Sequence, residues 1–370
     1  MNAVNHSNEP SPSTFSLKSL IRLISYCIVA SVLFFLASRY LIYWYDWPTT
    51  VESLQNLFSS SQANAEASTR NLKALFLLLG IASLVAILLF LTKKSTNIDL
   101  SYDAKRFKNW SYFLIRAAFW AVFLVGTADA LISLLRVENF LIPLAGQELN
   151  DTLGLASKRG LYVHYPLIVL AIIIALFTHS LGFIWLSFLV VLAEFTIVLT
   201  RFIFSYEQAY MGDLVRFWYA ALFLFASAYT LMEGGHVRVD VLYARMGNRK
   251  KAWVNAIGSL VLGLPVCWAI LHYGVGSPQS SLVAPILSYE VSQSGYGMYV
   301  KYLMGGFLII YAASMAFAFV SVFLSSCAYL FNEPNAELPS GGELEALAAL
   351  DDTLKIKPGL EPDLKNGALK

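Results

Sequence analysis

Residues 162–203 read YVHYPLIVLAIIIALFTHSLGFIWLSFLVVLAEFTIVLTRFI, and this long apolar stretch decides the fold class. A helix needs about 20 predominantly apolar residues to cross the hydrocarbon core of a bilayer. One helix over the whole stretch would greatly exceed that thickness. Polar residues and a glycine at 178–182 favour a tight hairpin, so the sequence predicts two membrane spans here, at 162–180 and 183–203.

Six more apolar runs of similar length predict further spans, at roughly 20–45, 72–92, 110–135, 214–232, 254–273 and 300–326. The 370 residues are 57% hydrophobic and 14% charged, whereas soluble domains carry about 25% charged residues. We therefore predict an all-α fold, a polytopic transmembrane helical bundle of about eight spans. The net charge of +2 gives no indication of nucleic-acid binding. The first apolar run lacks a nearby cleavage site, so we expect a retained helix rather than a signal peptide.

Basic residues predict the orientation, because loops rich in Lys and Arg stay in the cytoplasm. Segments 93–109 and 232–253 carry five basic residues each, whereas 46–71 carries one and 274–298 none. Eight spans place both basic segments and both termini on the same side, which predicts an N-in, C-in topology. The segment 136–161 would then be periplasmic, although it contains Arg136, Lys158 and Arg159. Residues 332–370 have a composition typical of a disordered cytoplasmic tail.

Ionisable residues within spans are costly and mark a functional site or a packed polar contact. Asp129 and Glu194 are expected deepest in the membrane, and Glu194 lies seven residues before Arg201, two turns along the same helical face. A cation relay needs several converging carboxylates, often with interrupted helices, and no span has that pattern. We therefore interpret Asp129, Glu194 and Arg201 as intramembrane polar contacts. Four arginines near span ends are expected to extend to the interface: Arg22, Arg39, Arg201 and Arg216.

Signs of catalysis or of a cofactor are weak. A b-type haem needs two histidines at matched depth on two helices, and His164, His179, His236 and His272 do not form such a pair. The three cysteines lie inside apolar runs, unlike a disulfide framework or a thiolate metal site. Walker A and nucleophile-elbow motifs are absent from the sequence. We predict that the protein is not an enzyme and that it has no catalytic residue, metal or cofactor.

Residues 233–243 read EGGHVRVDVLY at the predicted cytoplasmic end of a span. The side chains of His236, Arg238 and Asp240 are able to form charge-assisted hydrogen bonds to one another, to a neighbouring subunit or to lipid headgroups. The two glycines allow the chain to leave the helix sharply. The alternative interpretation is an ordinary basic loop.

Residues 234–243 of this string resemble the signature of the small, Q-type subunit of tripartite ATP-independent periplasmic (TRAP) transporters. Arg201-Phe202-Ile203-Phe204 is similar to the end of that family's first span, and residues 288–292 resemble its mannitol/chloroaromatic-like branch. The resemblance covers roughly residues 183–330. It departs at Asp213, where the family usually has Glu, and at Met304, where Pro is common. We therefore predict an N-terminal four-helix extension (1–180), a small-subunit-like domain (181–331) and the tail (332–370).

The resemblance implies a small membrane subunit in a bacterial inner membrane. Such a subunit scaffolds the large TRAP membrane subunit and helps dock a periplasmic substrate-binding protein during sodium-coupled uptake of an organic acid. His236, Arg238 and Asp240 are then candidates for subunit assembly, and Asp213, Glu290 and Glu207 for periplasmic docking. Two alternatives stay open: a self-sufficient secondary transporter or channel that uses Asp129 and Glu194, and a membrane redox enzyme that uses the histidines.

Overall fold

The computed structural model describes residues 17–58, 65–95, 98–179, 183–205, 209–233, 243, 245–292 and 297–336. All regular structure in these ranges is helical. The elements are α1 (Leu17–Tyr45), α2 (Thr50–Phe58), α3 (Ala65–Lys94), α4 (Leu100–Val137), α5 (Leu141–Ala145), α6 (Gln147–Leu153), α7 (Ala156–Arg159), the π-helical turn η1 (Gly160–His164), α8 (Tyr165–Phe177), α9 (Phe183–Phe204), α10 (Ala209–Glu233), α11 (Asn248–Gly258), the π-helical turn η2 (Ser259–Gly263), α12 (Leu264–Val275), α13 (Val283–Ser288) and α14 (Lys301–Leu330).

The predicted spans are confirmed. Within the described ranges, eight helical segments are long and apolar enough to cross a bilayer, and each overlaps one predicted span. Helix α8 ends at Phe177 and α9 begins at Phe183, so the opening stretch does form two helices. Residues 180–182 of the predicted hairpin lie outside the described residues.

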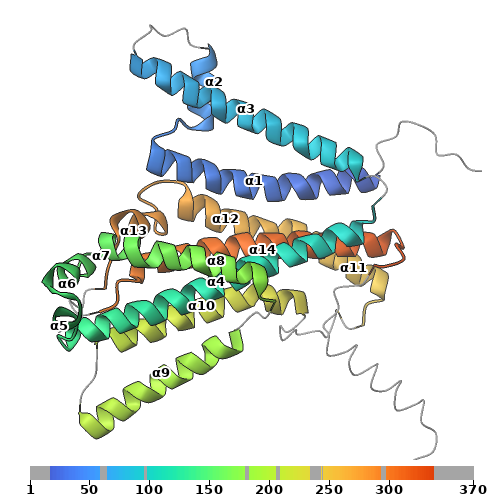
Figure 1. The fold of residues 1–370 in the computed structure, drawn as a ribbon. Helices are drawn as coiled ribbons and strands as arrows, with labels where there is room; N and C mark the ends of the chain where they lie inside the picture. Colours follow the sequence, from blue (N-terminus) through green and yellow to red (C-terminus); the bar gives the residue numbers. More distant parts are fainter. Residues whose placement is uncertain are drawn as a thin grey trace, which may run out of the picture.

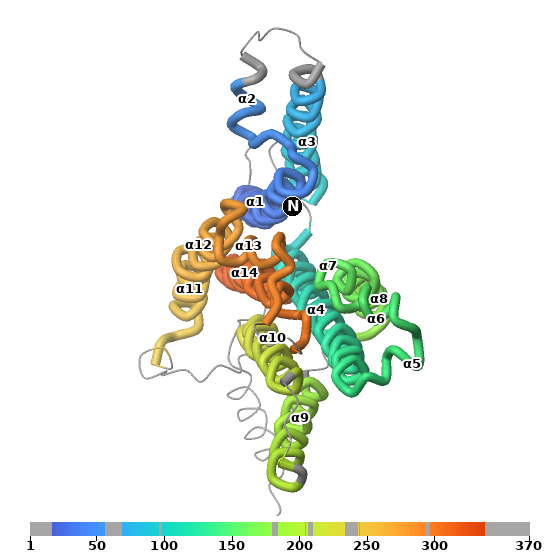
Figure 2. Tube along the Cα trace, turned by 90° about the vertical axis from the view of Figure 1, so that its left-hand side faces the viewer, coloured from blue at the N-terminus to red at the C-terminus, as the bar shows by residue number. Residues whose placement is uncertain are grey.

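Helix α14 is the centre of the bundle. In the most apolar 18-residue stretch of α14, 72% of the residues are buried. The helix packs against α4, α10, α11 and α12 (Figures 1 and 2). The Ser111 hydroxyl on α4 donates to the Ser314 carbonyl on α14 at 2.9 Å, and the Ser321 hydroxyl on α14 donates to the Ala104 carbonyl on α4 at 2.7 Å. Such small polar residues let membrane helices approach closely and pair. The contact joins the predicted segments 1–180 and 181–331, a division that stays a prediction.

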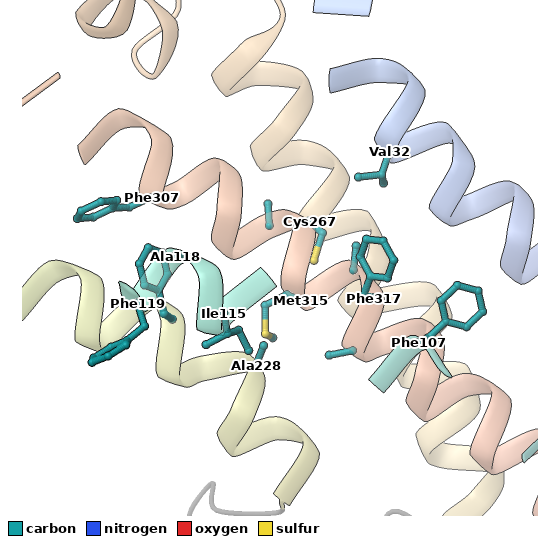
Figure 3. Packing of buried hydrophobic residues seen from close by; sticks show 14 of the residues in the cluster. Val32, Phe107, Ile115, Ala118, Phe119, Ala228, Cys267, Phe307, Met315 and Phe317 are labelled. Atoms are coloured by element: carbon teal, nitrogen blue, oxygen red, sulfur yellow. The ribbon is translucent and has the colours of Figure 1, made fainter. Parts of the chain in front are cut away.

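Aromatic side chains fill the space around this contact (Figure 3). Phe107 of α4 lies 6.2 Å from Phe317 of α14 between ring centroids. Between α4 and α10 the packing is closer still, because Trp218 lies against Gly126. A Cβ atom on Gly126 would stand 2.4 Å from the indole nitrogen, so only glycine fits at this crossing.

The two ends of the bundle are distinguished by contacts between helix termini. Lys18, at the start of α1, forms a 2.9 Å ion pair with Glu333, just beyond α14. Toward the other end, the Tyr43 hydroxyl donates to the carbonyl of Val275, where α12 ends, at 2.6 Å. The first span thus begins on the side where the last span ends, as an even number of spans requires. The N-in orientation remains a prediction.

Helix α4 begins at Leu100, ten residues before the predicted span, so Lys105, Arg106 and Lys108 lie on a helix rather than in a loop. The additional turns form because Leu100, Ala104 and Phe107 recur at helical spacing and are buried on one face. Lys105 and Arg106 are exposed.

The expectation that Arg22 extends to the interface is wrong. Its side chain is 1% exposed, and Nε donates to the Asp103 carboxylate at 2.5 Å. The other guanidinium nitrogens donate to the carbonyls of Ser95 and Ile98, in the connection between α3 and α4. Arg22 is buried because a carboxylate and two carbonyls, all within reach, replace its hydration.

Candidate functional site

A buried polar cluster surrounds Asp129, near the end of α4 that leads into α5. Its carboxylate accepts three hydrogen bonds: from Arg159 Nη1 at 2.9 Å, from His164 Nε2 at 3.0 Å and from the backbone N–H of Tyr299 at 2.8 Å. Asp129, Arg159 and His164 are each 0% exposed. We call Asp129, Arg159, His164, Tyr299 and Tyr302 the Asp129 cluster.

Arg159 is the positive partner in the cluster. In addition to Asp129, its guanidinium contacts the Ser133 hydroxyl at 3.3 Å and the Leu153 carbonyl at 2.8 Å. It lies over the Tyr299 ring, 4.2 Å from the centroid, in a cation–π arrangement. The sequence places Arg159 in a periplasmic connection, whereas the structure buries it at the end of α7, inside a membrane-spanning segment.

His164 links Asp129 to the central helix. Its Nδ1 lies 2.9 Å from the Tyr302 hydroxyl of α14. Its Nε2 carries the hydrogen of the contact with Asp129, because an ionised carboxylate only accepts, and the Tyr302 hydroxyl pairs with Nδ1. The cluster thus pairs the Asp129 carboxylate with the Arg159 guanidinium, and the imidazole of His164 joins both to α14 through Tyr302.

The π-helical turn η1 explains how Arg159 and His164 reach the same carboxylate oxygen. In an α-helix, residues five apart point in directions about 140° from each other, because each residue turns about 100°. The i→i+5 bonding of a π-helix aligns them more closely, and the Tyr165 N–H does bond to the Gly160 carbonyl. Gly160 also lets two tyrosines approach, since a Cβ atom there would lie 2.9 Å from Tyr289 and from Tyr302.

The chemistry of this arrangement is that of a structural ion pair. An ionised carboxylate offers about four acceptor positions, and protein donors take three of those on Asp129. The cluster therefore connects α4, α7, η1 and α14, and its geometry is poorly suited to binding and releasing a cation.

The other predicted intramembrane residues do not join this cluster. Glu194 and Arg201 both lie exposed on α9. Helix α9 packs mainly against α10, and only 6% of the residues in its most apolar 18-residue stretch are buried.

Of the periplasmic docking candidates, Asp213 and Glu290 are described. Asp213 lies in the first turns of α10 with its side chain 12% exposed, 3.9 Å from Arg216 Nη1. Glu290 follows α13, and Lys301 donates to its carboxylate at 2.7 Å. This ion pair reduces the negative charge expected for the segment 274–298. Glu207 lies outside the described residues.

The motif residues His236, Arg238 and Asp240 also lie outside the described residues. Glu233, directly before the motif, is described. It forms a 3.0 Å ion pair with Lys108 and accepts a hydrogen bond from the Tyr112 hydroxyl. Both partners are on α4, so these contacts hold the end of α10 against α4.

Sequence reasoning missed the roles of Arg159, His164 and Tyr302. Two signals pointed to the pair with Asp129: a lone carboxylate deep in one span, and an arginine in a predicted periplasmic connection, which is an unusual place for a basic residue. No sequence signal pointed to Tyr302, because tyrosines are common throughout this chain.

Comparison with known proteins finds a family match for only the C-terminal part of the bundle. Residues 188–328 match the family model described as tripartite ATP-independent periplasmic transporters, DctQ component. No curated protein and no solved structure gives a significant match to the chain. The matched region runs from α9 to α14 and contains Tyr299 and Tyr302, whereas Asp129, Arg159 and His164 precede it. The chain is thus a multi-pass membrane protein whose residues 188–328 are similar to the DctQ component of TRAP transporters, a transporter component rather than an enzyme family.

Proposed function

We propose that this chain is the small membrane subunit of a TRAP secondary transporter in a bacterial inner membrane. It scaffolds a large transport subunit and helps dock a periplasmic binding protein for sodium-coupled uptake of an organic acid. The family match over residues 188–328 supports a TRAP component. The branch of the family, the substrate and the coupling ion belong to the proposal.

The observation that carries the scaffold role is the outer face of α9. Its exposed side chains are large and apolar, among them Trp185, Phe188 and Phe195, yet Glu194 is exposed among them. Glu194 stands near the middle of α9, about 15–17 Å from either end. An ionisable side chain at that depth costs roughly 2.5–3.5 kcal/mol in lipid. A face with these properties fits a membrane protein with a hydrogen-bond donor better than it fits acyl chains.

Two further regions complete the proposal. His236, Arg238 and Asp240 stabilise assembly at the cytoplasmic ends of the spans, where Glu233 already ties α10 to α4. Asp213, Glu290 and Glu207 contribute polar groups for the binding protein at the periplasmic face. A self-sufficient transporter is less well supported, because Asp129 is engaged by protein donors and Glu194 lies on a separate, outward face.

The test is co-purification of the tagged chain from its native membrane. We expect a large multi-span protein to co-elute with the wild type and much less of it with Glu194→Leu, because the polar contact is lost. Glu148→Leu is the matched control, since Glu148 is an exposed carboxylate on α6, away from α9. Undiminished co-elution with Glu194→Leu, or solute uptake by the chain alone in liposomes, would contradict the proposal.

A further inference from the structure

A large apolar cleft lies between α1, α3 and the first turns of α4. Its volume is about 760 Å³, within the range of small-molecule sites. Along α1 the lining runs from Tyr26 to Leu41, about 22 Å at 1.5 Å per residue. Figure 1 shows α1 and α3 close together where α1 begins and diverging toward the other end. The cleft is thus long, and its direction follows the membrane-spanning helices.

The interior of the cleft offers no free hydrogen-bond donor to a ligand. Its polar side chains between the two ends are serines that already donate to their own helices: Ser38 to the Phe35 carbonyl and Ser83 to the Gly80 carbonyl, both at 2.8 Å. The Tyr26 hydroxyl donates to Asp103 at 2.8 Å. A plain hydrocarbon chain, which needs no hydrogen bond, therefore suits this interior.

One end of the cleft carries a positive charge. Arg106 lines it and is exposed, and its guanidinium makes no ion pair or hydrogen bond with the described residues. The nearby carboxylate of Asp103 is already paired with Arg22. Trp110, one turn further along α4, lines the same end, and tryptophan prefers the headgroup level of a bilayer. Arginine binds phosphate in a bidentate manner.

We propose that this cleft is a binding site for one anionic membrane phospholipid, with an acyl chain between α1 and α3 and the headgroup phosphate on Arg106. The site is independent of the small-subunit function, because it lies outside residues 188–328 except for the contribution of Phe317. The lipid fills the space between α1 and α3 and so stabilises their packing against α4.

Two substitutions in the cleft, each with a matched control, test the proposed lipid site. Arg106→Ala removes the phosphate contact, and Lys105→Ala is its control, an exposed neighbour that does not line the cleft. Gly80→Leu fills the cleft, because a Cβ atom at Gly80 meets no atom within 4 Å. Gly258→Leu is the control for that change, since Gly258 also has open space and lies on α11, outside the cleft.

The experiment reconstitutes full-length protein in vesicles of phosphatidylglycerol and phosphatidylcholine, purifies it in mild detergent and counts retained lipid by native mass spectrometry. We expect one phosphatidylglycerol per wild-type chain, at least a fivefold lower retention with Arg106→Ala and Gly80→Leu, and no change in the controls. Added phosphatidylglycerol should raise the melting temperature of the wild type and not of Arg106→Ala. A cooperative melting transition of Arg106→Ala without added lipid shows that this variant is folded. Equal retention of the two lipids, unchanged retention in both variants, or a co-purifying protein helix in place of lipid would overturn the proposal.

Discussion

The ion pair between Asp129 and Arg159 makes the sharpest prediction. Replacing Asp129 by Asn keeps the size of the side chain and removes the charge opposite Arg159, which is 0% exposed. Three donors converge on this carboxylate, and a hydrogen bond to a charged group is worth about 1.5–3 kcal/mol. A simple sum gives roughly 4.5–9 kcal/mol, which is too large because the Asn oxygen still accepts and such contacts are not additive. We therefore expect a loss of about 3–5 kcal/mol in the free energy of unfolding, the usual cost of leaving one partner of a buried ion pair alone.

The assay is reversible unfolding in mixed micelles, titrated with SDS and followed by helical circular dichroism. Lys158→Met is the matched control, because Lys158 is the exposed neighbour of Arg159 and such surface changes usually stay within about 0.5 kcal/mol. The double variant Asp129→Leu with Arg159→Met leaves no unpaired charge. Its loss in the free energy of unfolding should therefore be smaller than the sum of the losses measured for Asp129→Leu alone and Arg159→Met alone. A cost for Asp129→Asn equal to that of Lys158→Met, or strictly additive single costs, would refute the structural role of the pair.

Three further predictions concern other parts of the bundle. Arg22→Met should lower the free energy of unfolding by about 3–5 kcal/mol in the same assay, because it leaves Asp103 buried without its cation; a loss below about 1 kcal/mol would contradict the buried pairing. Gly126→Leu should destabilise the contact between α4 and α10 by about 1–3 kcal/mol or more, since Trp218 occupies the space, whereas Gly306→Leu, with no atom within 4 Å of its Cβ position, should cost much less in parallel melts. Single cysteines at Ser281 and Asn248 should react with membrane-impermeant thiol reagents from the periplasm and from the cytoplasm, respectively; the reverse labelling would overturn the N-in topology.

A docking role for Asp213 and Glu290 is testable in liposomes that contain both membrane subunits. Replacing both residues by Lys should raise the concentration of binding protein needed for half-maximal uptake, most clearly at low salt, because ions screen such steering within about 8–10 Å. An unchanged concentration with unchanged salt dependence would remove this role. The ion pair between Glu290 and Lys301 makes Lys301→Ala an informative companion variant, since it frees the carboxylate.

The number and order of the membrane spans are determined by the sequence alone. Each span is a local property: a helix in lipid satisfies its own backbone hydrogen bonds and needs only enough consecutive apolar residues. The division of the stretch 162–203 into two helices follows in the same way from a few polar residues and a glycine. The resemblance of the C-terminal half to a TRAP small subunit was also readable from a short string, and the family match over residues 188–328 supports it.

The partners of the buried charges were decided only by the tertiary structure. Arg159 lies 30 residues from Asp129 and Arg22 lies 81 residues from Asp103, so neither pair has a periodic pattern along the chain. The π-helical turn that points Arg159 and His164 at one carboxylate is a local deviation that hydropathy does not predict. The central position of α14 likewise depends on small residues that meet other helices at close range. Membrane insertion depends on each segment's affinity for lipid, whereas pairing depends on which segments pack together, and that information exists only when the helices are assembled.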